Sequence, residues 1–478
     1  MATCSAARVR RSRAAQRALA LVIACATLVR LRGIWGIVDV DTDAYGHAVV
    51  ARRMIEHPTD LAVHWVWLPL WHAVHALFEL AGAGFEAVRA LSFCASIATV
   101  ALVFVCAFRE FAVEFEPESE PLAVLSATVS SAAMAFAPHA IESAVSAEPE
   151  ATFALWVFGA FAALRWQRPW LAGALLSLAA LTRYEAWPLI AAVFALDVAL
   201  RARRDRGATA AWALPAMIVA LWCVVHRAHS GEWLWFVREN RAFVARALPR
   251  LVPVLPPIER RALWYPITIP WIDWGALPLL ASLSGFVLWL REKRWVWVLA
   301  PAAIVGFVSF AWVRGQHLGL VRHAVSYLSF YAMAMGAGLC FAQKRLSIRL
   351  TNRWRLVFVC ASLGWFALRG AHAAGELGVR ARARLSRDVA AASALSRARR
   401  TDAVFCDNAV VEVLSRLHRS QFIRWSAADI RAANIDVEQR RHGAVWIVSK
   451  PSNVAAIEAR CERVFESPTV LVLRALPR

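Results

Sequence analysis

The chain has 478 residues, of which 59% are hydrophobic and 18% are charged, with a mean hydropathy of +0.49. This composition is too apolar for a soluble domain and indicates a protein with many membrane spans. The formal net charge of +20 comes almost entirely from arginine, because the chain has only three lysines. Together with the abundance of alanine, this bias indicates genome composition, so we expect no nucleic-acid partner.

Apolar segments predict the membrane topology. An arginine-rich N-terminus precedes the first segment and imitates a signal peptide, but the many spans that follow favour an uncleaved first helix. We expect a mostly α-helical polytopic protein with about eleven transmembrane helices, near residues 18–38, 87–108, 122–139, 150–164, 170–183, 186–200, 209–226, 274–290, 295–313, 324–342 and 356–372.

Basic residues orient these helices. The N-terminus falls on the same side as four basic segments, at residues 165–169, 201–206, 291–294 and 344–355, and the positive-inside rule makes that side cytoplasmic. The opposite side receives the tail after residue 373 and the loops at 39–86, 140–149, 182–187, 227–272 and 314–323. We therefore expect a multi-pass protein of the inner (cell) membrane with a cytoplasmic N-terminus and an exterior, periplasmic tail.

The tail changes character at about residue 376. A polar helical stretch leads into short β-rich runs, with helical patterns between them, at 403–408, 421–425, 444–450 and 469–476. We expect a transmembrane domain over residues 1–375 and a small C-terminal α/β extramembrane domain over residues 376–478. Cys406 and Cys461 are the only cysteines of the second domain, and an oxidising exterior would allow a disulfide between them.

Three acids, Asp39, Asp41 and Asp43, occupy alternate positions after the first apolar segment. One of Asp41, Thr42 and Asp43 can cap the next helix, because side-chain oxygens accept the free N–H groups of a first turn. A cap needs only one residue. We therefore expect at least one of these carboxylates to act as a general base or as a ligand to a metal.

Several segments resemble the C-type glycosyltransferases, polytopic enzymes that take sugars from polyprenyl-phosphate donors and include protein mannosyltransferases and aminoarabinose transferases. The first is DTDAYGHAVVARRM with the apolar sequence that follows it. The others follow in the family's order, and they are SAEPEATFALW (146–156), ALTRYEAWPLI (180–190) and VRHAVSYLSFYAMAMGAG (321–338). The resemblance covers residues 18–340.

The resemblance implies catalytic roles by position. Asp43 matches the catalytic acid of the first external loop, with Asp41 as a second acid or a metal partner. The family often has a second acid beside the first, where this chain has Ala44. The second carboxylate is therefore Asp41, Glu142 or Glu148. Near the last external loop, where the family often has Arg-Tyr, this chain has Arg322 and His323.

Competing structural explanations exist for the other candidates. Glu148 and Pro149 suit an ordinary helix start. Arg183 and Glu185 flank Tyr184 in a tight turn and can simply pair at the membrane surface, although charge in a membrane is costly without a function. We keep Glu148 as a catalytic candidate, and the substrate-binding candidates are Arg322, Arg183, Glu185, Tyr184 and His323.

Two further groups fit ordinary membrane roles. Arg30 and Arg32, in the outer half of the first helix, are expected to snorkel to the interface. His64, His72 and His75 lie among tryptophans that are typical of an interfacial belt. No carboxylate or cysteine completes a zinc pattern beside these histidines.

We expect an inverting transfer of a sugar from a polyprenyl-phosphate donor to an acceptor hydroxyl. Asp43 would take the acceptor proton, and Arg322, with Arg183 in reserve, would stabilise charge on the departing phosphate. The sequence establishes no cofactor, although Asp41 and Asp43 suit a divalent cation, Mg²⁺ or Mn²⁺. Membrane lipid is an expected partner, and the acceptor is a glycan, a lipid or a protein.

Two other classes of function compete with transfer. A transporter or lipid flippase would favour internal repeats and broken helices near the midplane, whereas the acids here lie in loops and the sequence has no evident repeat. A non-catalytic membrane scaffold that displays the tail would tolerate changes of the loop acids.

Overall fold

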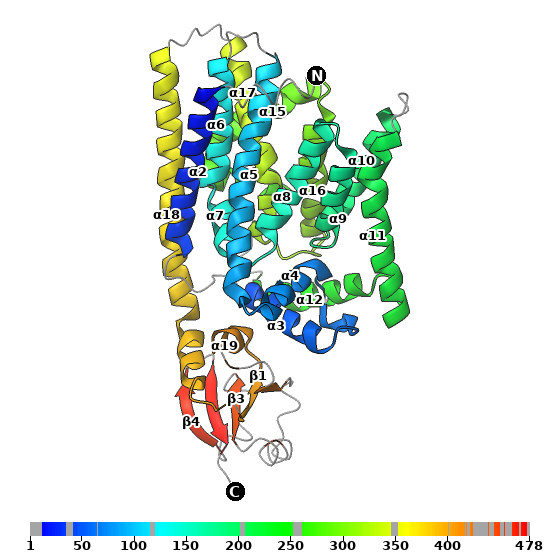
Figure 1. Cartoon of the computed structure of the whole chain (residues 1–478), viewed down its shortest axis with the longest axis vertical. Coiled ribbons are helices and arrows are strands. Elements are labelled where there is room, and N and C mark those ends of the chain that lie inside the picture. The colour runs from blue at the N-terminus through cyan, green and yellow to red at the C-terminus, as the bar shows by residue number, and fades with distance from the viewer. Residues whose placement is uncertain are drawn as a thin grey trace. The chain divides into compact units, whose positions relative to one another are not determined.

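The structure is a computed structural model (Figure 1). It describes residues 12–34, 42–64, 66–114, 120–200, 206–251, 261–345, 352–399, 401–415, 417, 421–423, 438, 444–449, 454, 461–467 and 470–475. The chain forms two compact units. The bundle unit comprises Met1–Trp35, His64–Trp71 and Arg89–Gly375, and the tail unit comprises Gly36–Val63, His72–Val88 and Glu376–Arg478. The predicted domain boundary at residue 375 stays a prediction.

Long helices make up the bundle unit (Figure 1). Their bounds are α2 Arg13–Ile34, α5 Gly84–Glu114, α6 Glu120–Phe136, α7 Pro138–Val145, α8 Glu150–Arg165, α9 Pro169–Ala180, α10 Ala186–Leu200, α11 Arg206–Ser230, α12 Trp235–Leu251, α14 Ile269–Trp274, α15 Ala276–Arg291, α16 Trp295–Val313, α17 Val325–Arg345 and α18 Asn352–Leu395. The first residues of α5 and the last of α18 belong to the tail unit. Short helical turns, η1 Leu61–His64, η5 Trp264–Thr268 and η6 Val321–Ala324, occur between them.

The helices confirm the predicted fold class, a mostly α-helical multi-pass membrane protein. Among the described residues, five helices are long and apolar enough to cross a membrane, and the bent pair α6 and α7 makes a sixth. Three shorter apolar helices, Pro169–Ala180, Ala186–Ala199 and Ala276–Arg291, fall below that length. The predicted count of about eleven spans is therefore not confirmed.

Arg30 joins α2 to the break between α6 and α7, where the two helices differ in direction by 58°. The break lies before Pro138, and it leaves carbonyl groups of the last turn of α6 without helical donors. Arg30 Nη1 donates to Ala135 O at 2.7 Å, Arg30 Nε donates to Ser96 Oγ at 3.0 Å, and Trp274 Nε1 donates to Ala133 O at 2.9 Å. The expectation that Arg30 snorkels is wrong. Its side chain is fully buried, because the broken helix offers it acceptors and a negative dipole end.

Helices α15 and α17 approach each other at two glycines. A methyl group built on Gly285 of α15 would lie 1.9 Å from the carbonyl oxygen of Ala334. One built on Gly338 of α17 would lie 2.0 Å from the carbonyl oxygen of Ala281. Only glycine allows two helix backbones to pack this closely.

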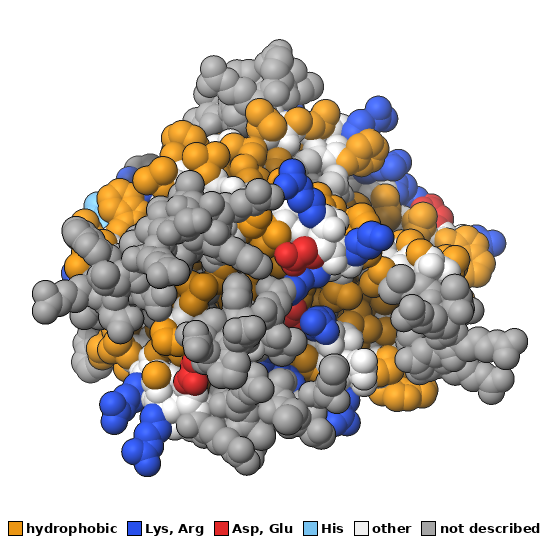
Figure 2. All heavy atoms as spheres, turned by 90° about the horizontal axis from the view of Figure 1, so that it is seen from above, with side chains coloured by type: hydrophobic (Ala, Val, Ile, Leu, Met, Phe, Trp, Pro, Cys, Tyr) orange, Lys and Arg blue, Asp and Glu red, His pale blue; other side chains and the backbone are white. Residues whose placement is uncertain are grey.

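Ion pairs mark one end of the bundle. Glu110, near the end of α5, is buried and accepts from Arg165 at 2.7 Å and from Arg294 at 2.9 Å. The sequence analysis placed both arginines on the same side of the membrane. Figure 2 shows one end of the molecule, where basic side chains lie near acidic ones among hydrophobic side chains.

The tail unit contains a five-stranded sheet with the order β2-β1-β3-β5-β4. The strands are β1 Ala403–Cys406, β2 Phe422–Ile423, β3 Val445–Ser449, β4 Cys461–Glu466 and β5 Leu471–Ala475. Strands β2, β1 and β3 are parallel, and β5 is antiparallel to both β3 and β4. This sheet confirms the predicted small α/β portion of the fold class, but the sequence analysis missed β4. Three charged residues within the six-residue sequence CERVFE hide its pattern.

The sheet excludes the disulfide between Cys406 and Cys461 that an oxidising exterior would allow. Cys406 lies on β1 and is a free thiol, and Cys461 lies on β4, with β3 and β5 between the two strands. Three strand spacings amount to about 14 Å. A disulfide needs α-carbons within about 7 Å of each other.

The tail unit also contains three helices. They are α3 Thr42–Glu56, α19 Ala409–Leu414 and the tail-unit part of α4 Pro69–Leu80. Of these, α19 contacts both β1 and α3. His47 of α3 lies against His72 of α4, with 2.9 Å between His47 Nδ1 and His72 Nε2. His47 and His72 therefore pack between α3 and α4. The expectation that His72 belongs only to an interfacial aromatic belt is therefore incomplete.

Candidate active site

A short connection between α7 and α8 places two buried acids, Glu148 and Glu150. Three side chains hold its backbone carbonyls. Arg89 donates to Val145 O at 3.0 Å, Trp71 to Ala147 O at 2.9 Å and Ser92 to Glu148 O at 3.1 Å. Glu150 is the first residue of α8, where negative charge is favourable to the helix dipole. The predicted helix start is therefore present, and it also aims two carboxylates at neighbouring loops.

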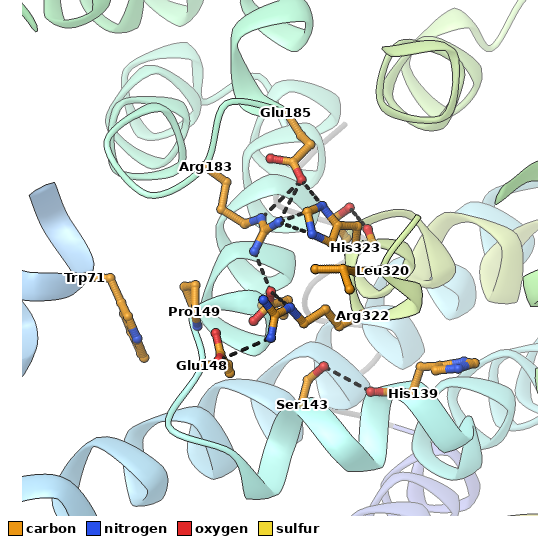
Figure 3. A network of polar contacts seen from close by, with 12 residues as sticks. Trp71, His139, Ser143, Glu148, Pro149, Arg183, Glu185, Leu320, Arg322 and His323 are labelled. Atoms are coloured by element: carbon orange, nitrogen blue, oxygen red, sulfur yellow. Dashed lines mark hydrogen bonds and ion pairs between the residues drawn. The ribbon is translucent and has the colours of Figure 1, made fainter. Parts of the chain in front are cut away.

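The turn between α9 and α10 supplies Arg183. Its guanidinium donates to Glu185 Oε1 at 2.8 Å through Nη2 and at 3.2 Å through Nε, and Nη1 pairs with Glu150 Oε1. Arg183 thus binds one carboxylate of its own turn and one from the start of α8 (Figure 3). A single guanidinium fixes the turn against α8.

The segment before α17 supplies Arg322 and His323 from η6. Arg322 Nη1 lies 3.3 Å from Glu148 Oε1, and its Nε lies 3.3 Å from Glu150 Oε1. His323 Nδ1 lies 2.6 Å from Glu185 Oε1. Figure 3 shows Arg183 below Glu185, and Arg322 between Arg183 and Glu148. The structure thus brings together five of the predicted site residues, which are Glu148, Arg183, Glu185, Arg322 and His323.

Besides Glu150, two residues extend this network beyond the predicted set. His317 Nε2 lies 3.2 Å from His323 Nδ1, and His317 Nδ1 accepts from the backbone N–H of Gly319 at 2.9 Å. Tyr265 of η5 donates to Leu320 O at 2.9 Å and its hydroxyl lies 3.3 Å from His317 Nδ1. The loop 314–320 is therefore fastened to η5 and to the arginine network.

The local electrostatics keep both Arg183 and Glu185 charged. Burial disfavours the charged form of Arg183, but Glu185 and Glu150 outweigh this effect and raise its pKa. Burial likewise opposes ionisation of Glu185, but Arg183 and His323 lower its pKa well below the usual range. Burial, assisted by Arg183 and Arg322, lowers the pKa of His317 to about 4, so this imidazole is neutral at pH 7.

The arrangement suits recognition of an anion. Two guanidinium groups from separate loops meet at Glu150, and planar guanidinium groups bind phosphate oxygens bidentately as readily as they bind carboxylates. Glu150 Oε2 is a buried oxygen that has no hydrogen-bond partner among the described residues. A polar group of a ligand would satisfy it, because an unpaired buried acceptor costs free energy.

The remaining predicted site residues lie elsewhere. Asp43 is in the first turn of α3, in the tail unit, and is partly exposed. Asp41 and Asp39 lie outside the described residues. Tyr184 stacks its ring on Phe236 of α12, with 5.0 Å between the ring centroids, and meets Trp187 edge-on. Tyr184 therefore packs α12 against the turn that carries Arg183.

The predicted metal site stays a prediction. Within the described ranges, no group of three His, Cys, Asp or Glu side chains is arranged to hold a metal ion. Of the two acids proposed as ligands, only Asp43 belongs to those ranges. One described carboxylate does not make a site for Mg²⁺ or Mn²⁺, which need several oxygen ligands.

His317 and Tyr265 belong to predicted external loops and Glu150 to the start of a predicted span, but the sequence patterns did not select them as site residues. Glu150 was hidden by the adjacent helix-start signal of Glu148 and Pro149. His317 stands six residues before His323 in the sequence HLGLVRH, and a second histidine in so short a loop was the available signal. Tyr265 carries no such signal within its aromatic stretch.

Comparison with known proteins supports the fold. No protein-family model and no curated protein sequence matches the chain. Solved structures do match, among them the crystal structure of ArnT from Cupriavidus metallidurans in the apo state, with 15% sequence identity, a TM-score of 0.63 and coverage of 96% of this chain and 99% of that chain. The crystal structure of the same protein bound to undecaprenyl phosphate has 14% identity, a TM-score of 0.64 and the same coverage. The chain therefore has the ArnT fold over nearly its full length, in agreement with the predicted polytopic fold.

Proposed function

We propose that this chain is a membrane glycosyltransferase that uses a polyprenyl-phosphate-linked sugar as donor. The observation that carries the proposal is the convergence of Arg183 and Arg322 on Glu150 at one end of the bundle. The ArnT structure with the same fold has undecaprenyl phosphate bound. A lipid phosphate requires cationic partners beside an apolar surface, and this end of a membrane helix bundle offers both.

The two arginines would exchange carboxylates for phosphate. Both guanidinium groups are already paired with Glu148, Glu150 or Glu185, so a donor phosphate must share or replace one of these acceptors. Carboxylate and phosphate oxygens accept the same forked pair of N–H groups. The acids thus hold the arginines in place before the donor arrives, and the arginines then stabilise charge on the departing phosphate.

Asp43 would act as the general base. In an inverting transfer, the acceptor hydroxyl attacks the anomeric carbon while the bond to the phosphate breaks, and a carboxylate takes the hydroxyl proton. Of the three clustered acids Asp39, Asp41 and Asp43, Asp43 is the one that the structure describes, and it lies in the first turn of α3. Asp41 and Glu148 are the candidates for the second carboxylate.

The transferred group would be a hexosyl or pentosyl unit, and the acceptor a hydroxyl of a glycan, lipid or protein. We place the reaction at the outer face of the inner membrane, with the N-terminus in the cytoplasm and the tail outside. Labelling of a cysteine introduced near Ser452 tests this topology in intact cells. A label that appears only after permeabilisation would reverse the assignment.

Transfer itself is tested with the purified protein in lipid vesicles. A radiolabelled sugar on undecaprenyl phosphate is supplied with cell-envelope extract as acceptor, and release of undecaprenyl phosphate is followed. We expect turnover by the wild type and a large loss in Arg322→Ala. Arg165→Ala is the matched control, because Arg165 pairs with Glu110 at the other end of α8. Movement of the donor across the bilayer without cleavage would favour the transporter instead.

A further inference from the structure

Within the tail unit, α3 lies on α19 of the C-terminal sheet domain (Figure 1). Tyr45, Ala48 and Val49 recur at helical spacing on one face of α3 and are buried at 0%, 7% and 5% exposure. They form one hydrophobic cluster with Val410 and Val413 of α19. The helix that begins beside Asp43 therefore buries its apolar face against the tail.

Arg52 adds polar contacts one turn after Ala48. Its Nε donates to Glu79 Oε1 of α4 at 3.1 Å, and its Nη1 lies 3.8 Å from Glu412 Oε1 of α19. The side chains of Arg52 and Glu412 are 13% and 11% exposed. Burial raises the pKa of Glu412, and the charge of Arg52 opposes that rise. One arginine thus links α3 to two other helices in a largely dry environment.

Helix α19 is itself firmly held. Asn408 Oδ1 caps it by accepting from the backbone N–H groups of Val410 at 3.0 Å and Val411 at 3.2 Å. The amide nitrogen of Asn408 donates to Asp388 of α18 at 2.7 Å. Since Asn408 follows β1 by two residues, the cap ties α19 to the sheet and to α18 at once. Helix α19 can therefore serve as a fixed support.

We propose that the C-terminal domain sets the orientation of α3, and that Arg52 is a positioning residue that places Asp43 through this helix. The proposal rests on the proposed function, in which Asp43 is the general base. Arg52 lies nine residues after Asp43, which is about 13 Å along a helix, so it acts through α3 and not by contact with substrate. The tail thereby takes part in the reaction without touching the donor.

The test compares Arg52→Ala, Arg52→Lys, Glu412→Gln and the exchanged pair Arg52→Glu with Glu412→Arg, all in the full-length protein. We expect Arg52→Ala to lower kcat about tenfold or more, because small displacements of a reacting group are costly, while the KM for the donor stays near that of the wild type. Amide hydrogen exchange over residues 42–56 should become faster. Arg52→Lys and the exchanged pair should each recover part of both losses.

Arg463→Ala is the control, because Arg463 pairs with Glu466 on an exposed part of β4 and should change neither quantity. Val413→Ala, which keeps all charges, covers the case in which Arg52→Ala fails to fold, and it should also speed exchange over residues 42–56. If Arg52→Lys, Glu412→Gln and Val413→Ala all behave like Arg463→Ala, the proposal is overturned. Absence of transfer by the wild type would instead count against the proposed function, and the exchange data alone would then decide whether α19 fixes α3.

Discussion

His323 and Glu185, 138 residues apart in the chain, meet with 2.6 Å between Nδ1 and Oε1. The contact ties the turn between α9 and α10 to the segment that precedes α17. Arg322 is adjacent to His323, and Arg183 donates to the same oxygen of Glu185. The two arginines are therefore held at a fixed separation, as recognition of one anion by two cations requires.

Replacing Arg322 should weaken donor binding. We expect Arg322→Ala to raise the Kd for undecaprenyl phosphate about tenfold, equal to about 1.4 kcal/mol, and to slow transfer. Arg322→Lys should recover only part, because a point charge replaces a planar fork. Binding is measured with the lipid in detergent micelles and compared with Arg165→Ala. If affinity and rate both survive in a stable Arg322→Ala protein, the phosphate is held elsewhere, with Arg183 the next candidate.

Replacing Glu150 should change binding in the opposite direction. Glu150→Gln removes the carboxylate that both arginines share while keeping its size, so the phosphate no longer competes with it. We expect affinity for undecaprenyl phosphate to rise about threefold to tenfold, which corresponds to the net free energy of one ordinary hydrogen bond. The affinity of Glu150→Gln for undecaprenyl phosphate is measured in the same detergent micelles. Weaker binding would mean that Glu150 organises the arginines more than it opposes the phosphate.

Asp43→Asn should abolish transfer in a folded protein. The amide keeps the size of the side chain and part of its capping ability, but it cannot take a proton. We expect kcat to fall by about 10² to 10⁴ with unchanged affinity for undecaprenyl phosphate. Asp39→Asn should have a smaller effect. Turnover near that of the wild type would move the base to Asp41 or Glu148, or exclude the transferase.

His317 should make stability depend on pH. Its pKa is lowered to about 4 in the folded chain, whereas an unfolded histidine titrates near 6.5. Between pH 4 and pH 6.5 the unfolded state binds a proton at this histidine and the folded state does not. The free energy of unfolding therefore falls as the pH falls from 6.5 to about 4. The stability is fully present above pH 6.5. His317→Asn, which can still accept from Gly319, should flatten this slope in thermal unfolding measured in detergent, and equal slopes in both proteins would contradict the assignment.

Arg30 should matter for folding and not for chemistry. Arg30→Met keeps the length of the chain but removes the donors to Ala135 O and Ser96 Oγ, leaving buried acceptors unpaired. We expect a loss of about 2–3 kcal/mol, seen as a lower unfolding midpoint in detergent. Arg32→Met is the control on the same helix, because Arg32 lies on an exposed part of α2. Unchanged stability would show that water satisfies the broken helix.

The sequence predicted many of the helices because apolar length is a local signal. It also selected Arg183, Glu185 and Arg322, because charges beside apolar runs stand out. It could not pair Arg322 with Glu148, since 174 residues separate them and only packing of α8 beside α17 brings them together. The prediction for Arg30 was wrong for a related reason. Its acceptor Ala135 O is available only because α6 breaks before Pro138, and no pattern around residue 30 reveals this break.

The glycines of α15 and α17 limit how the protein can admit a lipid. A shift of α17 along α15 that replaces either glycine at its contact would place a β-carbon against a backbone carbonyl of the opposing helix. Because η6 leads directly into α17, this contact also limits movement of Arg322 and His323. We therefore expect an opening for a donor to come from the turn that carries Arg183 or from the connection that carries Glu148. A mutation that enlarges either glycine would be expected to disturb the anion site from within the membrane, at a distance from every charged group.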